Sequence, residues 1–181
     1  MREDRERWDK RYRQEPEPRE ASRLVREFSG LAIPGNALDI AAGQGQNALY
    51  LSQLGFRVEA VDISKEALAQ VGRRSNLHPV CADLDLFDIL PKRYNLIVNI
   101  RFLNRRLLPQ ILGGLKPSGV LIFEAFLEGG GSDYKTAHPE YRLQANELLR
   151  AFSPLRIVYY RENIVHGEQT RPLAALVGIK P

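Results

Sequence analysis

Short apolar segments alternate with amphipathic segments along most of this 181-residue chain. The amphipathic segments have the spacing of helices, and Ser64 is placed to cap one of them. This alternation predicts an α/β fold, doubly wound and Rossmann-like, in which helices cover both faces of a sheet. The predicted strands are ALDIAA, RVEAVD, PVCAD, YNLIVNI and VLIFEAF, and the helices between them are NALYLSQLG, KEALAQVGRRS and RRLLPQILGGLK.

The two ends of the chain depart from this alternation. Residues 1–35 are predicted to be helical, with an interruption at Pro16 and Pro18. Trp8 and Tyr12 are four residues apart, so they share one helix face. Near the other end, RIVYYRENI and LAALVGI are predicted strands of a hairpin, preceded by a surface loop and a short helix over ANELLRAF. We therefore expect seven strands in one domain.

The segment AAGQGQNA, between the first strand and its helix, carries a glycine turn. Gly43 and Gly45 would let a ligand approach the backbone N–H groups at the start of the helix, and Ala48 takes a third small position. Asp62 follows about twenty residues later, close to the spacing of a dinucleotide-binding fingerprint. A glycine pattern alone also fits a tight turn that binds nothing, so its neighbours decide its meaning.

Three aspartates lie at the ends of the first three predicted strands. Asp39, four residues before Gly43, suits a ligand with a positive amine or sulfonium and would repel a pyrophosphate. Asp62 can accept both hydroxyls of a ribose, and Asp83 can accept the exocyclic amine of an adenine, with Leu84 as an apolar neighbour of the ring. Each aspartate alone could be a cap or a turn former. Together with the glycine turn, they predict one adenosyl ligand with a cationic amino-acid part.

Composition and charge limit the alternatives. The formal charge is +4, and no apolar run reaches the roughly 20 residues that span a bilayer, so we expect no membrane partner. The charged N-terminus lacks the apolar core of a secretory signal, and Cys81 is the only cysteine, which predicts a cytoplasmic protein without disulfides. Basic and acidic side chains are mixed near the N-terminus, which favours an ion-paired helix over a nucleic-acid-binding arm.

These motifs resemble those of the class I S-adenosylmethionine-dependent methyltransferases. LDIAAGQG is similar to their first motif, AVDIS to their acidic second-strand end and CADL to their adenine-contacting segment, and the region from YNLIVNI to VLIFEAF resembles their fourth strand, helix and fifth strand. WDKRY, GQGQNALYLSQLGFRVEAVDIS, ANELLRAFS and VYYRE resemble the small tellurite-resistance-type and thiopurine-methyltransferase-like branch. Ala41 and Ala42 stand where many relatives have glycine and cysteine, and Ser118 replaces a common glycine.

The resemblance implies a single methyltransferase domain over residues 1–181, with the seven strands in the order 3-2-1-4-5-7-6 and strand 7 antiparallel. It implies S-adenosylmethionine as cofactor and S-adenosylhomocysteine as product, with residues 1–35 as a helical lid over the cofactor. The aromatic face of Trp8 and Tyr12 could instead pack the first helix onto the sheet. The candidate cofactor-binding residues are Trp8, Tyr12, Asp39, Gly43, Gly45, Asn47, Asp62, Ile63, Asp83, Leu84 and Asn99.

The methyl acceptor is expected beside residues that follow the fourth and fifth strands and beside the terminal hairpin. Arg101 follows the fourth strand and Glu124 lies near the end of the fifth; the N-P-P-Y motif of many enzymes that methylate amino groups of bases or glutamine is absent here. In the tellurite-resistance-type relatives, a histidine and arginines of the terminal region are associated with the acceptor. By this resemblance, the candidate catalytic residues are His166, which would orient or deprotonate the acceptor, Arg171, which would attract an anion, and Arg101. His166, Arg171 and also His138 could equally be exposed loop residues.

Four functions remain compatible with the sequence. The first is methyl transfer to a small nucleophile, such as a thiol or a selenium or tellurium oxyanion, by in-line displacement with an optional general base. The others are an RNA or protein methyltransferase, a non-catalytic S-adenosylmethionine-binding protein, and a nicotinamide dehydrogenase, which Asp39 and the absence of a second domain disfavour. We expect a small-molecule acceptor, no nucleic-acid or membrane partner, no metal, and a monomer or homodimer.

Overall fold

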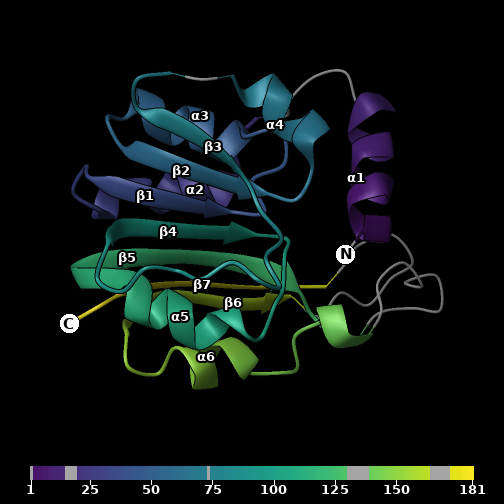
Figure 1. Ribbon diagram of the computed structural model, residues 1–181. Coiled ribbons are helices and arrows are strands. Elements are labelled where there is room, and N and C mark those ends of the chain that lie inside the picture. The colour runs from purple at the N-terminus through teal and green to yellow at the C-terminus, as the bar shows by residue number, and fades with distance from the viewer. Residues whose placement is uncertain (1, 15–19, 73, 130–138, 164–171) are drawn as a thin grey trace.

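One mixed sheet of seven strands forms the centre of the molecule (Figure 1). The strands lie in the order β3-β2-β1-β4-β5-β7-β6, and β7 is antiparallel to both of its neighbours, as predicted. The computed structural model describes residues 2–14, 20–72, 74–129, 139–163 and 172–181. The strands are β1 (Asn36–Ile40), β2 (Arg57–Asp62), β3 (Leu77–Cys81), β4 (Tyr94–Ile100), β5 (Leu115–Phe126), β6 (Arg156–Asn163) and β7 (Leu173–Ile179).

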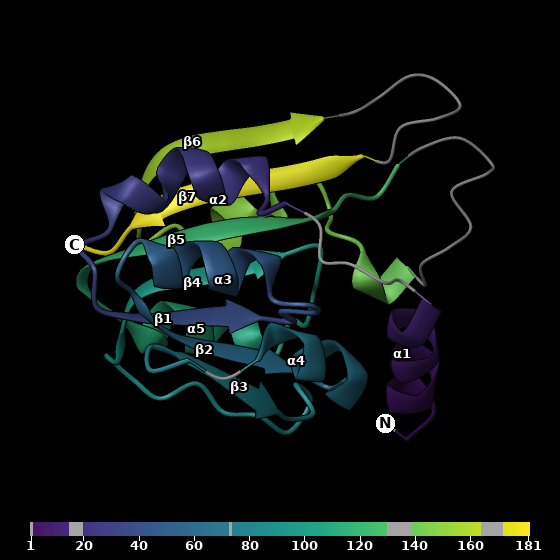
Figure 2. The ribbon, with the colours of Figure 1, turned by 90° about the horizontal axis from the view of Figure 1, so that it is seen from above.

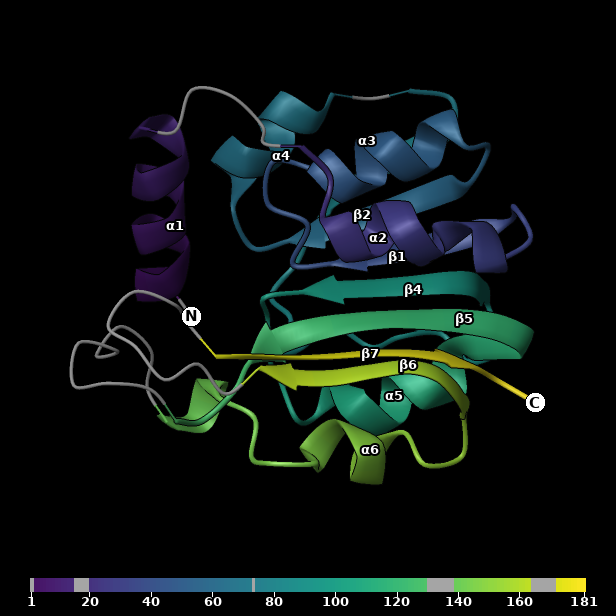
Figure 3. The ribbon, with the colours of Figure 1, turned by 180° about the vertical axis from the view of Figure 1, so that it is seen from behind.

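Helices cover both faces of the sheet (Figure 3). On one face α2, α3 and α4 bury Val25, Leu51 and Leu68, and on the other α5 and α6 bury Ile111 and Leu148. No helix within the described ranges is long and apolar enough to cross a membrane. The helices are α1 (Arg2–Gln14), α2 (Arg23–Phe28), α3 (Gln46–Gln53), α4 (Lys65–Val71), α5 (Leu107–Gly114) and α6 (Glu147–Ala151), with the short 3-10 helices η1 (Ser29–Leu31) and η2 (Pro139–Tyr141).

Helix α1 stands beyond the ends of the parallel strands (Figure 2). We call this side of the sheet, where β1 to β5 end, the carboxyl edge. Trp8 and Tyr12 stack with their ring centroids 5.8 Å apart, which confirms that they share a face of α1. Leu24 and Val25 of α2 are buried against the sheet, so of the two α-helices described within residues 1–35, α1 is the one that lies at the carboxyl edge. Its action as a lid stays a prediction.

The third strand differs from its sequence prediction. The sequence predicts a strand over residues 79–83, whereas β3 spans Leu77–Cys81, so Asp83 lies two residues beyond the strand instead of at its end. The last pair between β2 and β3 joins Asp62 to Cys81, where β2 also ends. The carbonyl of Asp83 then accepts hydrogen bonds from the N–H groups of Leu86 and Phe87, and this turn replaces strand pairing.

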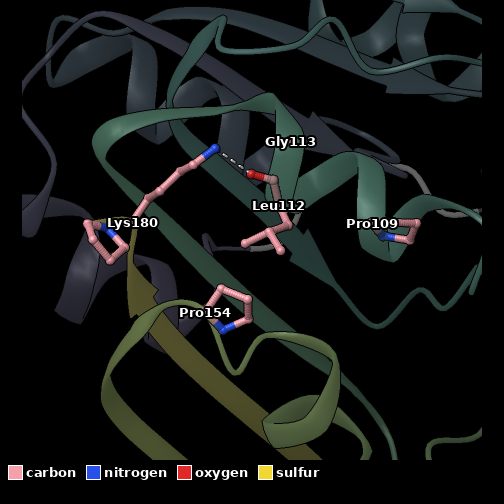
Figure 4. A pocket seen from close by; sticks show the side chains of 6 residues that line it. Pro109, Leu112, Gly113, Pro154 and Lys180 are labelled. Carbon is pink, nitrogen blue, oxygen red and sulfur yellow. Dashed lines mark hydrogen bonds between the residues drawn. The ribbon is translucent and has the colours of Figure 1, made fainter.

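A hollow of about 430 Å³ lies at the opposite end of the sheet from the carboxyl edge (Figure 4). The ammonium group of Lys180 donates to the carbonyls of Leu112 and Leu115, both at 2.9 Å, and so satisfies acceptors at the end of α5. Lys180 therefore has a structural role, and this hollow contains none of the predicted site residues. Its lining residues are Pro109, Leu112, Gly113, Pro154, Lys180 and Pro181.

Candidate functional site

The turn between β1 and α3 adopts a backbone conformation that favours glycine. The φ angle is +56° at Gly43 and +75° at Gly45, in the left-handed region that side chains rarely adopt. A Cβ atom on Gly45 would lie 2.6 Å from Val71, and one on Gly43 would lie 2.7 Å from the hydroxyl oxygen of Tyr12. Ala41 also has a positive φ, of 54°, so surrounding contacts must hold a strained turn in place.

Asp62, at the end of β2, fixes the glycine turn. Its carboxylate accepts hydrogen bonds from the N–H of Gly43 and the N–H of Ser64, both at 2.8 Å. The residue is 6% exposed, and burial raises its pKa although these bonds and one from the backbone of Ile63 act to lower it. The predicted ribose-binding carboxylate therefore lies directly against the turn that is predicted to hold the same ligand.

Asp39 is a buried carboxylate beneath the same turn. It is 1% exposed, and burial raises its pKa to about 7, with a further contribution from the negative charge of Asp62. Hydrogen bonds from the N–H of Ala48 and the side chain of Asn47 oppose this shift. Asn47 is itself held, because its Oδ1 accepts from the N–H of Ser22 at 2.8 Å. The Oδ2 atom of Asp39 is buried and has no hydrogen-bond partner among the described residues.

Backbone hydrogen bonds tie together the ends of β1, β2 and β3. The N–H of Ala42 donates to the carbonyl of Val61, and the N–H of Ala82 donates to the carbonyl of Asp62, both at 3.0 Å. Asp39, Asp62 and the start of the loop that carries Asp83 therefore lie along one edge of the sheet.

The two residues predicted to contact adenine differ in their surroundings. The Oδ1 atom of Asp83 accepts from the N–H of Asp85 at 3.0 Å, which holds the carboxylate in the loop after β3. The side chain of Leu84 is 6% exposed and packs in the core on the α5 face. Most of that side chain therefore serves the core, and its contact with an adenine ring stays a prediction.

Helix α1 is attached to the end of β2 through Ser64. The carboxylate of Asp9 accepts from the Ser64 hydroxyl at 2.6 Å and from the N–H of Glu66 at 3.3 Å. Burial acts to raise the pKa of Asp9, but these hydrogen bonds outweigh it and the pKa is lowered. Arg13 adds an ion pair with Glu66 at 2.9 Å. Since the N–H of Ser64 also donates to Asp62, one residue joins α1 to the predicted ribose site.

The ends of β4 and β5 form the other side of the carboxyl edge. Asn99 is 2% exposed, and its Nδ2 donates to the carbonyl of Phe102 at 2.7 Å. Arg101 has a positive φ of 61°, and its N–H donates to the carbonyl of Glu124 at 2.7 Å. The Arg101 Nε atom lies 3.7 Å from Oε1 of Glu124. Burial raises the pKa of Glu124, and the nearby charge of Arg101 reduces this shift. Arg101 and Glu124 therefore form a charged pair on the side where the acceptor is expected.

Three further candidates, His138, His166 and Arg171, lie outside the described residues. The predicted roles of His166 and Arg171 at the acceptor stay predictions.

Asp9 is not identifiable from the sequence as the contact between α1 and the site. Charged residues of both signs surround Asp9 in the chain, and nothing in that pattern distinguishes it from the neighbouring carboxylates that do not contact Ser64. Ser64 was detectable only as a helix cap, which it is, since its hydroxyl accepts from the N–H of Ala67 at 3.1 Å. Its second contact, with Asp9, depends on the tertiary position of α1.

The strand order, the glycine turn and the acidic strand ends together define the structural class of the S-adenosylmethionine-dependent methyltransferases. Within this class the chain belongs to the TehB family, because the family model for tellurite resistance protein TehB matches residues 3–172.

Two individual proteins and one solved structure are also similar to the chain. The chain is 32% identical over 99 residues to a probable S-adenosyl-L-methionine-dependent methyltransferase TehB of Haemophilus influenzae, a match that covers 51% of this chain and 35% of that protein. It is 28% identical over 165 residues to hemagglutinin 1 of Eikenella corrodens, covering 82% of this chain and 54% of that protein. The crystal structure of TehB from Haemophilus influenzae superposes with a TM-score of 0.77 at 20% identity, covering 96% of this chain and 67% of that one. The chain thus spans about half or less of the length of the curated relatives it matches.

Proposed function

We propose that the protein is a methyltransferase that uses S-adenosylmethionine and acts on a small-molecule nucleophile. The observation that carries this proposal is the buried Asp39 carboxylate beneath a glycine turn that Asp62 also holds; its Oδ2 atom has no hydrogen-bond partner in the part of the chain that the structure describes. A cationic amino-acid group is the kind of partner that such an oxygen lacks. The TehB family membership supports the same cofactor.

The residues present fit this cofactor. Gly43, without a side chain, lets Tyr12 lie against the turn, and Asp62 provides a carboxylate that can accept ribose hydroxyls. When bound, S-adenosylmethionine would supply a methyl carbon that an acceptor lone pair attacks in line, while the bond from this carbon to sulfur breaks and S-adenosylhomocysteine leaves without further activation. Asp39 would neutralise the amino-acid end, Asp83 would contact the adenine, and Gly45, Asn47, Ile63 and Asn99 would shape the surrounding walls.

The protein's own contribution would then be alignment and exclusion of water. Tyr12, which lies against Gly43, and Trp8 beside it on α1 would cover the cofactor as part of a lid. On the other side, Arg101 and Glu124 would face the acceptor, and His166 and Arg171 would orient or attract it. This division assigns the cofactor mainly to the ends of β1 to β3, with Asn99 of β4 at its border, and the acceptor to the segments that follow β4 and β5.

A small acceptor is favoured over a nucleic acid because three arginines of the N-terminal region are paired with carboxylates of this chain. Arg7 pairs with Asp4, Arg26 pairs with Glu20, and Arg13 pairs with Glu66. Paired arginines offer little free positive charge to a phosphate backbone. A cytoplasmic location and a monomeric or dimeric state are parts of the same proposal.

Titration calorimetry with S-adenosylmethionine, S-adenosylhomocysteine and NAD tests the cofactor. We expect saturable binding of the first two compounds and none of NAD. Transfer from methyl-labelled S-adenosylmethionine to thiols, selenite and tellurite, with bulk RNA as a comparison, tests the acceptor class. Binding of NAD alone would overturn the whole proposal, whereas labelling of RNA alone would overturn only the small-molecule acceptor.

A further inference from the structure

The turn between β4 and α5 contacts loops on both sides of the carboxyl edge. It consists of Asn104, Arg105 and Arg106, and we call it the β4–α5 turn. The Oδ1 atom of Asn104 accepts from the N–H of Arg106 at 3.0 Å, which fixes the turn locally. The side chains of these consecutive residues then bind two segments that are far apart in the sequence.

Asn104 and Arg106 bind the loop after β3, residues 83–88, which we call the adenine-side loop. The Nδ2 of Asn104 donates to Oδ1 of Asp85 at 2.8 Å. The guanidinium of Arg106 donates to Oδ1 of Asp88 at 2.9 Å and to the carbonyls of Leu84 and Phe87. This loop begins with Asp83, the residue proposed to contact adenine.

Arg105 binds the segment of residues 139–147, which we call the acceptor-side segment. Its Nε and Nη2 atoms donate to the two carboxylate oxygens of Glu147 at 2.7 and 2.9 Å, a bidentate pair. Nη1 donates to the carbonyl of Glu140 at 2.6 Å, and Nη2 also donates to the carbonyl of Arg142 at 2.8 Å. One side chain therefore holds both ends of this segment.

The acceptor-side segment belongs to the carboxyl edge. The N–H of Leu143 donates to the carbonyl of Phe126 at 2.8 Å, so the segment lies along the chain that leaves β5. Burial raises the pKa of Tyr141, and the charges of Asp4 and Arg7 on α1 act on the same pKa, so this segment lies within electrostatic range of α1. A shift of the segment would thus reach both the end of β5 and α1.

We propose that the β4–α5 turn positions the two halves of the site relative to each other, with Asn104 and Arg106 holding the cofactor side and Arg105 holding the acceptor side. This inference rests on the proposed function and deepens it. The two arginines are adjacent on one fixed turn. A ligand that reduces the motion of the adenine-side loop would therefore also reduce the motion of the acceptor-side segment. Arg105 and Arg106 are in this account positioning residues, not catalytic ones.

Hydrogen–deuterium exchange and calorimetry on the whole chain test this proposal, with S-adenosylhomocysteine as the probe. In the wild type, saturating S-adenosylhomocysteine should slow exchange in both the adenine-side loop and the acceptor-side segment. Arg106→Met should weaken S-adenosylhomocysteine binding by about fivefold, the effect expected for lost hydrogen bonds in a binding loop. Arg105→Met should leave that affinity within about twofold, yet lose the ligand-induced protection of the acceptor-side segment.

The controls separate positioning from general stability. Arg156→Met removes an exposed arginine at the other end of the sheet and should reproduce neither effect. If an arginine variant does not fold, a change in its partner residue replaces it. Glu147→Gln weakens the pair with Arg105, and Asp88→Asn weakens the pair with Arg106. Protection of the acceptor-side segment that persists in Arg105→Met or Glu147→Gln would overturn the inference. Absence of S-adenosylhomocysteine binding by the wild type would instead defeat the proposed function.

Discussion

The hydroxyl oxygen of Tyr12 lies 2.7 Å from the position that a Cβ atom on Gly43 would occupy. This contact joins α1 to the glycine turn across more than thirty positions of the sequence. It gives Gly43 two separate reasons to lack a side chain, a φ of +56° and the presence of the Tyr12 ring above it. Helix α1, which we propose as a lid, and the glycine turn can therefore be tested together.

Gly43→Ala should weaken binding of S-adenosylhomocysteine by roughly tenfold or more, because the alanine strains the turn by about 1 kcal/mol and also displaces Tyr12. Tyr12→Phe is the matched control, since it keeps the ring and removes only the oxygen that meets the Cβ atom. In the double variant, the loss of affinity caused by Gly43→Ala should be smaller, because the alanine Cβ atom no longer meets the Tyr12 oxygen. Calorimetry of the single and double variants measures this coupling, and strictly additive losses would show that Tyr12 and Gly43 act independently.

Asp62→Ala should lower the affinity for S-adenosylmethionine and S-adenosylhomocysteine by more than about tenfold, because charge-assisted hydrogen bonds to the ribose are lost. The same change frees the N–H of Gly43 and the N–H of Ser64, so the variant must be shown to fold by circular dichroism. Glu128→Ala, which removes an exposed carboxylate just beyond β5, serves as the control. Unchanged affinity in folded Asp62→Ala would remove Asp62 from the ribose site.

The sheet was largely predictable because its determinants are local. Buried parallel strands require apolar runs, and the crossings between them require helices, so the pattern around RVEAVD and YNLIVNI already carried the architecture. The strand order came from resemblance to a family. The sequence places the end of the third strand at Asp83, because this residue continues a strand-like run. In the structure β3 ends at Cys81, and the carbonyl of Asp83 accepts hydrogen bonds from Leu86 and Phe87 in a turn.

The placement of candidate site residues was predictable where an acidic residue lies at the carboxyl end of a parallel strand, and their roles toward a cofactor stay predictions. Asp39 and Asp62 satisfy this condition, and they meet at the glycine turn. Contacts that depend on tertiary placement gave no comparable signal. Arg105 and Arg106 are identical in type and adjacent in sequence, yet they bind opposite segments, and only the structure distinguishes them.

Asp9→Ala should detach α1 from α4. The Asp9 carboxylate accepts from the Ser64 hydroxyl and the N–H of Glu66, and its loss should cost about 1 kcal/mol, as for a lost helix cap. Because α1 is rich in arginine, limited trypsin digestion measures the detachment as faster cleavage within residues 2–14. Glu3→Ala on the same helix is the control. Equal cleavage rates for the two variants would count against Asp9 as the anchor.

His166→Ala should lower turnover and leave the affinity for S-adenosylhomocysteine nearly unchanged, since we assign this residue to the acceptor and not to the cofactor. Methyl-transfer assays with the acceptor that responds in the panel measure the first quantity, and calorimetry measures the second. Arg171→Ala should raise KM for an anionic acceptor more than it lowers kcat. Full turnover in His166→Ala would end its assignment to the acceptor site.

Asp39 should make both stability and ligand binding depend on pH. Burial raises its pKa from 3.8 to about 7, so between these values the folded protein retains a proton that the unfolded chain releases. The contribution of Asp39 to stability therefore falls as the pH rises from about 4 to about 7 and stays constant above that. The asparagine in Asp39→Asn does not titrate. The melting temperature of this variant minus that of the wild type should therefore increase with pH across this window and stay constant above it.

The same carboxylate should strengthen binding where it is ionised. Wild-type affinity for S-adenosylhomocysteine, whose amino group is positive, should increase as the pH approaches 7, whereas Asp39→Asn should bind weakly and without this dependence. Calorimetry and thermal melts at matched ionic strength between pH 5 and pH 8 measure both effects on one pair of proteins. Asp62 remains in both proteins, so its own raised pKa largely cancels in the comparison. Parallel melting curves and parallel affinities for the two proteins would mean that Asp39 does not carry the charge that holds the ligand.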